Sequence, residues 1–417
     1  MPLDIAFSAV FDGTELAPYW PYIKTYGPYV GATYLAKRFF GGARNSWERE
    51  MHGRVVMITG GTSGVGAAVA EELARRGAQL IFLVRSISDS WLVESIADLR
   101  ERTGNQLIYA EEVDLGSLYS VRKFATRWLD NTPPRRLDTI VCCANVMQPP
   151  FKQKVLTSDG VESQWAVNYL GHYHLLTLLA PAFRAQPADR DVRIILANCS
   201  TYVLGDLDLD DLEWKTRQYP SIRPWRVFAT SKLALYLFAR EFQRSFDTYK
   251  RPDGLPSHNI HVMLANPGFV RTSSSRNFIS LGSIWGLLLY LIMWPFWWLI
   301  LKSSNQGAQT LLHALSCPDG AIGEGVKVYN ECAELKTQSP LKIANDDEVA
   351  AELFARTKKQ IEVVERAAAL LRNQDKESRE STEPDNSKES FAKAGTKKAA
   401  NKANSDKSRK RKQTKKT

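Results

Sequence analysis

From Arg54 onward, short apolar runs alternate with segments of helical periodicity, and this alternation constrains the fold more than any other feature. Strands that alternate with helices form a parallel sheet covered by helices on both faces. The runs that we predict to be strands are 54–59, 79–84, 106–112, 137–144, 192–198, 260–266 and 325–329. The segments that we predict to be helices are 67–76, 117–129, 160–183 and 227–246. The sequence therefore predicts an α/β protein with a doubly wound parallel sheet.

The positive charge of the chain is confined to its C-terminal end. The 417 residues carry a formal net charge of +10, from 55 Lys and Arg against 45 Asp and Glu. Eleven of the basic residues and only Asp406 of the acidic ones lie in 393–417, so the preceding chain carries 44 of each sign. The composition of 373–417 is typical of a disordered tail, because it offers almost nothing to bury.

Three interpretations of this basic tail are open. It is a solvated run of charge, a segment that binds anionic lipid, or a nuclear-localisation or nucleic-acid patch. We favour lipid over the nuclear interpretation because an apolar segment occurs elsewhere in the chain. No nucleic-acid partner is expected.

The five cysteines indicate neither a disulfide framework nor a zinc site. Their number is odd and no CxxC spacing occurs among Cys142, Cys143, Cys199, Cys317 and Cys332. We therefore expect reduced thiols facing the cytosol, and no metal site.

Two extensions flank the predicted sheet. Residues 1–52 are rich in tyrosine and other aromatics and either pack on the domain or lie at a lipid interface, and both interpretations are open. Residues 334–372 form the second extension, where apolar residues recur at helical spacing over 346–372 and predict an amphipathic helix.

A glycine-rich loop lies between the first predicted strand and the first predicted helix. Its sequence is Ile58-Thr59-Gly60-Gly61-Thr62-Ser63-Gly64-Val65-Gly66. Glycine lets a backbone turn tightly and approach a pyrophosphate, and the following helix N-terminus offers free N–H groups to the phosphates. The loop therefore predicts a dinucleotide site on a Rossmann-type sheet. The residues that we expect to bind the cofactor here are Thr59, Gly60, Thr62, Ser63, Gly64, Val65 and Gly66.

With later motifs in matching order, this loop resembles the short-chain dehydrogenase/reductase family. The likeness covers about residues 53–333, and the wording of several motifs is similar to the retinol-dehydrogenase-like branch. It implies that Asp114, in Val113-Asp114-Leu115, contacts the adenine ring, and that small Ala144 permits close approach to the cofactor. The loop Pro267-Gly268-Phe269-Val270-Arg271-Thr272 resembles the one that holds the nicotinamide end. The further positions that the resemblance assigns to the cofactor are Asp114, Ala144, Asn168, Lys232, Pro267, Val270 and Thr272.

The resemblance also implies catalytic roles. Ser200 would polarise a carbonyl, Lys232 would hold the nicotinamide ribose and supply positive charge, and Asn168 would order a water. The family tyrosine that transfers a proton stands four residues before the lysine, and here that position is Phe228. A phenyl ring has no proton to give, and loss of a general acid costs on the order of 10²–10⁴ in rate.

Other residues near these motifs have less specific interpretations. Tyr202 and Tyr219 are candidates to replace the missing tyrosine, although an ordinary loop tyrosine is the simpler interpretation of each. Cys142 and Cys143 stand where the family has asparagines, and we interpret them as buried packing residues.

Arg85 follows the second predicted strand, near the expected adenosine ribose. A guanidinium there suits the 2′-phosphate of NADP, whereas an acidic residue would suit the 2′-hydroxyl of NAD. A solvated surface arginine is the alternative. We expect NADP(H).

The most apolar part of the chain is an insert at 278–302. Residues 284–301 carry no charge and include Trp285, Trp294, Trp297 and Trp298. Pro295 should break or kink a helix there. Since predicted strands of one sheet lie on both sides of the insert, a simple single membrane span is excluded. We favour a monotopic hairpin or interfacial helix over a helix buried in the core.

These observations predict a membrane- or lipid-droplet-associated, NADP-dependent oxidoreductase that interconverts carbonyl and alcohol on a lipophilic substrate. A retinoid, a sterol and a long-chain lipid fit equally. The expected location is the cytosolic face of the endoplasmic reticulum membrane or of a lipid droplet. The alternative is a catalytically weak or inactive relative that binds NADP(H) or serves as a scaffold, because Phe228 replaces the tyrosine.

Overall fold

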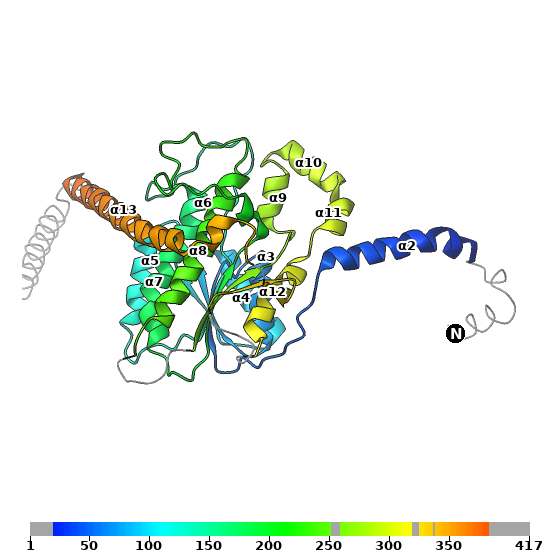
Figure 1. Cartoon of the computed structure of the whole chain (residues 1–417), viewed down its shortest axis with the longest axis horizontal. Helices are drawn as coiled ribbons and strands as arrows, with labels where there is room; N and C mark the ends of the chain where they lie inside the picture. The colour runs from blue at the N-terminus through cyan, green and yellow to red at the C-terminus, as the bar shows by residue number, and fades with distance from the viewer. Residues whose placement is uncertain (1–19, 252–258, 319–324, 337, 383–417) are drawn as a thin grey trace, which may run out of the picture. The chain divides into compact units, whose positions relative to one another are not determined.

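A single eight-stranded sheet forms the centre of the computed structural model, which describes residues 20–251, 259–318, 325–336 and 338–382 (Figure 1). The strand order is β3-β2-β1-β4-β5-β6-β7-β8. Strands β1 to β7 pair in parallel and only the short β8 is antiparallel to its neighbour. The strands are β1 Val55–Thr59, β2 Gln79–Val84, β3 Ile108–Glu112, β4 Thr139–Cys142, β5 Val192–Ala197, β6 Ile260–Asn266, β7 Lys327–Asn330 and β8 Ala333–Glu334. The predicted doubly wound α/β architecture is confirmed.

Helices cover both faces of this sheet, as Figure 1 shows. One face carries α3 Gly64–Arg75, α4 Ser90–Thr103 and α12 Ser304–Ser316, and the other carries α5 Leu118–Leu129, α7 Gly171–Arg184 and α8 Trp225–Asp247. Fully buried apolar side chains of the strands, such as Val56, Ile58 and Leu80, pack under α3 and α12. This burial is the main stabilising contribution to the sheet.

The predicted helix over 160–183 is interrupted close to the cofactor region. It consists of α6 Ser163–Trp165, a π-helical turn Ala166–Leu170, and α7. The Glu162 carboxylate caps its start by accepting a hydrogen bond from the Trp165 N–H at 2.8 Å. A π-helical turn inserts one residue and is frequent at functional sites, and here it contains Asn168.

The first compact unit reaches further than the predicted domain end at residue 333. It comprises Met1–Glu362, and the second unit comprises Val363–Thr417. Helix α13, Asp347–Thr382, packs its first half on the domain, where the Phe354 ring contacts Tyr173 and Phe238. This helix also continues beyond residue 373, where we predicted disorder to begin. Residues 383–417, with most of the predicted basic tail, lie outside the described part of the chain.

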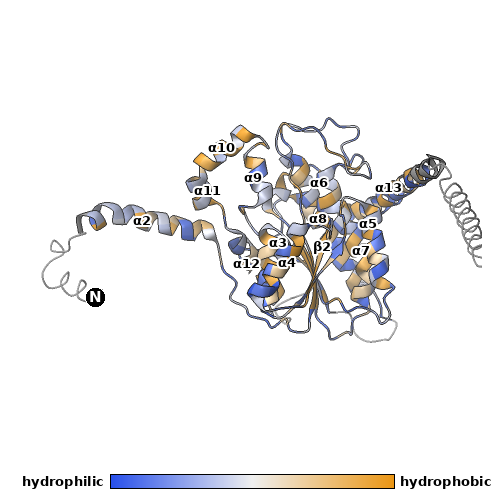
Figure 2. Cartoon of the chain, turned by 180° about the vertical axis from the view of Figure 1, so that it is seen from behind, coloured by the Kyte–Doolittle hydropathy of each residue, from blue (hydrophilic) through white to orange (hydrophobic). Residues whose placement is uncertain are grey.

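The apolar insert forms three short helices on the outside of the domain: α9 Ser273–Ile279, α10 Ile284–Ile292 and α11 Trp294–Ile300. The predicted break falls at Met293, next to Pro295 in the first turn of α11. The interpretation of the insert as a buried core helix is wrong, because Ile284 and Trp285 are about four-fifths exposed and Tyr290 is the one buried residue of α10. Figure 2 shows α10 as an apolar helix at the edge of the domain.

No single helix in the described residues is both long and apolar enough to cross a membrane. The pair α9 and α10 passes that test together by length and composition, with a bend of 105° between the two helices.

The N-terminal extension contains a helix that the sequence analysis did not predict, α2 Trp20–Gly41. The side chains from Tyr22 to Tyr26 and from Pro28 to Val30 are exposed, so this part of the helix does not pack on the domain. Contact with the domain is made near its C-terminal end, against α11.

Candidate active site

The glycine-rich loop joins β1 to α3, and two of its glycines are required by close backbone contacts. Gly60 has a φ of +65°, and a Cβ on it would lie 2.7 Å from the backbone nitrogen of Ala144. A Cβ on Gly66 would lie 2.2 Å from the Gly60 carbonyl oxygen. The loop is therefore folded tightly against the end of β4, and the N-terminus of α3 is left open toward a ligand.

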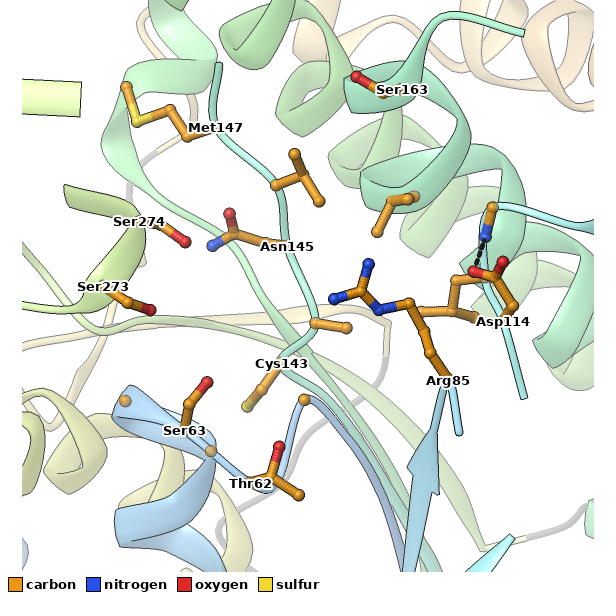
Figure 3. Close-up of a pocket in the computed structure, with 18 of the residues that line it drawn as sticks. Thr62, Ser63, Arg85, Asp114, Cys143, Asn145, Met147, Ser163, Ser273 and Ser274 are labelled. Atoms are coloured by element: carbon orange, nitrogen blue, oxygen red, sulfur yellow. Dashed lines mark hydrogen bonds between the residues drawn. The ribbon is translucent and has the colours of Figure 1, made fainter. Parts of the chain in front are cut away.

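A cavity of about 700 Å³ opens along this loop and the carboxyl ends of the strands (Figure 3). At one end it contains Arg85 and Asp114, and at the other it reaches Met147, Gln148 and the start of α9. The predicted cofactor-binding residues that line it are Gly60, Thr62, Ser63, Gly64, Val65, Gly66, Arg85, Asp114, Ala144 and Thr272. Ligands of open α/β sheets bind at this edge, so the position and the glycine cradle fit a dinucleotide.

Arg85 and Asp114 lie at one end of this cavity, the end at which the sequence predicts the adenosine. The Arg85 side chain is exposed and points into the cavity in Figure 3. Among the described residues no carboxylate pairs with its guanidinium. Asp114 accepts a hydrogen bond from the Gly116 N–H at 2.9 Å, which fixes its carboxylate in the loop after β3.

Two predicted cofactor residues instead have structural roles. Thr59 is fully buried, and its hydroxyl lies 3.0 Å from His172 Nε2 and accepts a hydrogen bond from the Ala144 N–H at 3.2 Å. Val270 is buried, and its side chain fills the space above Gly307 of α12. Neither side chain lines the cavity, and the same is true of the predicted cofactor residues Asn168 and Lys232. Pro267 does not line it either.

The buried His172 gives a pH-dependent prediction. Burial, and secondarily the Lys232 charge, lower the pKa of His172 from 6.5 to about 4. Since the unfolded chain binds a proton at a higher pH than the folded chain, stability is full above pH 6.5 and falls between pH 6.5 and 4. We expect the free energy of unfolding to fall there by roughly 3 kcal/mol more than in His172→Gln.

Chemical denaturation at several pH values measures this difference. The exposed His52 supplies the control variant, His52→Gln, which should follow the natural chain. Equal pH dependence in the natural chain and His172→Gln would show that His172 is not the group responsible.

Lys232 and Phe228 lie one helical turn apart on α8 and are both buried. The Lys232 ammonium donates a hydrogen bond to the Ala197 carbonyl at 2.9 Å and stands 5.6 Å from the centre of the Phe228 ring. Burial lowers the pKa of Lys232, and the nearby Cys199, Cys143 and Cys142 act in the opposite direction. The structure thus keeps the lysine of the motif at the end of β5, with a phenyl ring where the resemblance implies a phenol.

The predicted catalytic serine, Ser200, begins the short 3-10 turn that follows β5. Ser200 is exposed, and its hydroxyl accepts a hydrogen bond from the Asn266 amide at 2.7 Å. Cys199, one residue earlier, is half-buried, and its thiol lies 2.6 Å from the Thr201 hydroxyl. The role of Ser200 at a substrate carbonyl stays a prediction.

Asn168 is buried and its side chain is fully engaged. Its amide oxygen accepts from the Val146 N–H at 2.7 Å, while its amide nitrogen donates to the Val146 carbonyl at 2.9 Å and to Ser231 Oγ at 3.3 Å. Both amide hydrogens are thereby used, so the side chain has no donor left to order a water. Its effect is to hold the loop after β4, where Val146 lines the cavity.

Neither candidate tyrosine reaches the position of the missing phenol. Tyr202 stacks on Tyr236 and bonds to the Ser339 hydroxyl at 2.9 Å. The Tyr219 hydroxyl lies 2.9 Å from Gln148 Oε1 and 3.2 Å from Glu162 Oε1, and these two acceptors share its one proton. These contacts hold both tyrosines in the segment between β5 and α8.

Several residues that line the cavity were not predicted to bind the cofactor. Cys142 is buried as predicted, but Cys143 is only half-buried and lines the cavity, and burial raises its pKa to about 12. Asn145, Ser273 and Ser274 also line the cavity and are labelled in Figure 3. One signal could have identified these residues. They lie near the glycine loop, or they follow the Pro267–Thr272 motif along the chain.

Comparison with known proteins identifies the family. Residues 54–200 match the family model described as short chain dehydrogenase. An uncharacterized oxidoreductase of Schizosaccharomyces pombe is 44% identical over 367 residues, covering 88% of this chain and 97% of that protein. Human retinol dehydrogenase 13 is 32% identical, covering 80% of this chain and 92% of its own length, and mouse polyprenol dehydrogenase is 33% identical, covering 78% and 89%.

A solved structure has the same fold. An uncharacterized protein of Mycobacterium paratuberculosis aligns with a TM-score of 0.54 and 27% identity, covering 77% of this chain and 98% of the other. Together with the parallel sheet and the nicotinamide-dinucleotide cleft, these similarities show that the chain is an oxidoreductase of the short-chain dehydrogenase family, in its retinol-dehydrogenase-like branch.

Proposed function

We propose that this chain is an NADP(H)-dependent oxidoreductase that interconverts a carbonyl and an alcohol on a lipophilic substrate. A retinoid, a sterol or a long-chain lipid is the expected class. The observation that carries the proposal is the continuity between the cofactor cavity and the apolar insert. Helix α9 supplies Ser273, Ser274 and Asn277 to the cavity wall, and the chain runs directly from α9 into the exposed apolar α10. Two relatives are named for retinol and polyprenol, which are both apolar alcohols.

The same insert supports a location on a lipid surface. Its exposed tryptophans, of which Trp285 is 79% exposed, would be favoured in the headgroup region and are unfavourable in water. We place the protein on the cytosolic face of the endoplasmic reticulum membrane or of a lipid droplet, since its cysteines carry no disulfide pattern.

The residues of the chain would have separate roles in cofactor binding and catalysis. When bound, the nicotinamide cofactor supplies or accepts the hydride. The glycine loop and the N-terminus of α3 would hold the pyrophosphate, and Arg85 would lie near the adenosine ribose. Lys232 would supply positive charge for the nicotinamide ribose, and the Phe228 ring packs beside its ammonium.

NADPH oxidation by the full chain in detergent tests the proposal. Retinal, a sterol ketone and a long-chain aldehyde serve as substrates, with a short water-soluble aldehyde as the comparison, and cofactor binding is measured separately. We expect binding of NADPH and turnover that favours the apolar substrates. Binding without any turnover would favour the alternative, a cofactor-binding relative that Phe228 has silenced. A chain that binds no NADPH would contradict both.

Arg85 gives a prediction for the choice of cofactor. A guanidinium on the 2′-phosphate forms a charge-assisted hydrogen bond worth about 1.5–3 kcal/mol. Arg85→Glu should therefore raise the Kd for NADPH roughly 10- to 100-fold and leave that for NADH unchanged or lower. Titration calorimetry measures both constants. The exposed Lys123 on α5 provides a control with the same change of charge, Lys123→Glu. An equal effect of Arg85→Glu on both cofactors would refute a contact with the 2′-phosphate.

A further inference from the structure

Helix α2 exposes apolar and aromatic side chains that nothing in the described structure covers. Tyr22, Tyr26 and Tyr29 follow each other at helical spacing, and Tyr29 is 72% exposed. Phe39, near the end of the helix, is 80% exposed. An isolated helix that buries so little is marginal in water, so a second phase or partner must stabilise α2.

The C-terminal part of α2 is fixed to the apolar insert. The Lys37 ammonium donates hydrogen bonds to the Trp298 carbonyl and, at 3.2 Å, to the Leu301 carbonyl. It also lies 5.1 Å from the centre of the Trp298 ring. These carbonyls close α11 and lack partners within their own helix, so Lys37 caps α11 and joins it to α2.

Helix α2 carries positive and no negative charge, and the uncharged helices α10 and α11 are preceded in the chain by arginines without acidic residues. Residues 20–47 contain Lys24, Lys37, Arg38 and Arg44, residues 267–301 contain Arg271 and Arg276, and neither range contains Asp or Glu. Two copies of such a surface would repel each other, whereas anionic lipid headgroups would attract it. Tyrosine and tryptophan rings are favoured at the same headgroup level.

We propose that α2 and the pair α10–α11 form one two-part surface that binds an anionic lipid bilayer. This inference rests on the proposed contact of the insert with the membrane. It adds α2 as a second helix that contacts the same bilayer. Since α9 connects this surface to the cavity wall, the surface would hold the cavity next to the lipid phase. A lipophilic substrate could then enter along α9 without crossing bulk water.

Vesicle flotation of the full chain tests the proposal, with phosphatidylcholine vesicles and with vesicles that also contain phosphatidylserine. The variants are Tyr26→Glu with Tyr29→Glu on α2, Trp285→Glu with Leu288→Glu on α10, and Lys37→Met at the junction. Trp91→Glu on α4 is the matched control, since Trp91 is 55% exposed outside this surface. NADPH binding by each variant shows that the domain is folded.

We expect the natural chain to bind the phosphatidylserine vesicles more tightly than the others. The α2 and α10 double variants should each lose at least tenfold in affinity for the anionic vesicles, Lys37→Met should lose affinity, and Trp91→Glu should lose none. If only the α10 variant loses affinity, α2 is not part of the surface, although the proposed membrane association stands. Binding that all variants retain would assign the interaction to another segment, such as the basic tail, and overturn the proposal. A natural chain that binds neither vesicle overturns it together with the proposed membrane location, while NADPH turnover still tests the proposed chemistry.

Discussion

Phe228→Tyr is expected to raise turnover of NADPH with a lipophilic aldehyde by about 10²–10⁴, the usual contribution of a general acid. The Phe228 ring already stands beside Lys232, with the ammonium 5.6 Å from its centre. A hydroxyl on that ring would be a proton donor next to a fixed positive charge, which lowers the pKa of a phenol. The natural chain lacks this donor, so proton transfer should limit its rate. Steady-state kinetics of the two proteins at several pH values measures the gain.

Phe228→Leu is the control, because it alters the ring without adding a proton and should give no gain. The Kd for NADPH should be the same in all three proteins, since Phe228 does not line the cofactor cavity. A natural chain that already turns over as fast as Phe228→Tyr would mean that another group supplies the proton. Ser200→Ala would then be the next variant, because the resemblance assigns Ser200 a role at the substrate carbonyl.

Gly66→Ala is expected to weaken NADPH binding by at least 100-fold, which corresponds to about 2.7 kcal/mol. The added Cβ would lie 2.2 Å from the Gly60 carbonyl oxygen, and neither atom can move away without a shift of the backbone. The loop or the first turn of α3 must therefore shift, and the N–H groups for the pyrophosphate shift with it. Fluorescence titration with NADPH measures the Kd, and a thermal scan reports the accompanying loss of stability.

Gly31→Ala on α2 is the matched control, because no atom lies within 4 Å of the site of its Cβ. It should bind NADPH as the natural chain does. Unchanged binding by Gly66→Ala would show that the loop tolerates a side chain there, and the assignment of this loop to the pyrophosphate would lose its main support.

Most of the sheet could be predicted from the sequence, but its outer layers could not. Strands β2 and β6 have the predicted bounds because buried parallel strands are continuous apolar runs. Helix α4 was not predicted, since its mostly exposed surface leaves only a few apolar positions to mark its buried face, such as Leu92 and Leu99. Helix α2 was also missed, because Pro28 and several glycines break the usual helical signals.

Only part of the candidate site could be predicted from the sequence, because local residue patterns do not show how side chains pack in the fold. Glycines that a tight turn requires are visible in sequence, so Gly60, Gly64 and Gly66 were assigned correctly to the cavity. The direction of a side chain is not visible there. Thr59, for example, turns toward His172 and does not line the cavity.

The sequence by itself determined the doubly wound sheet, the dinucleotide loop and the loss of the phenol at Phe228, because each depends on local residue chemistry or on periodicity along the chain. Only the tertiary structure decided that the insert lies on the outside of the domain, since the same apolar run could form a core helix or a surface helix. It also decided that α2 joins the insert, through a contact between Lys37 and the end of α11 that spans 264 positions of the chain. Contacts between distant segments depend on how the whole chain packs, and no local pattern encodes them.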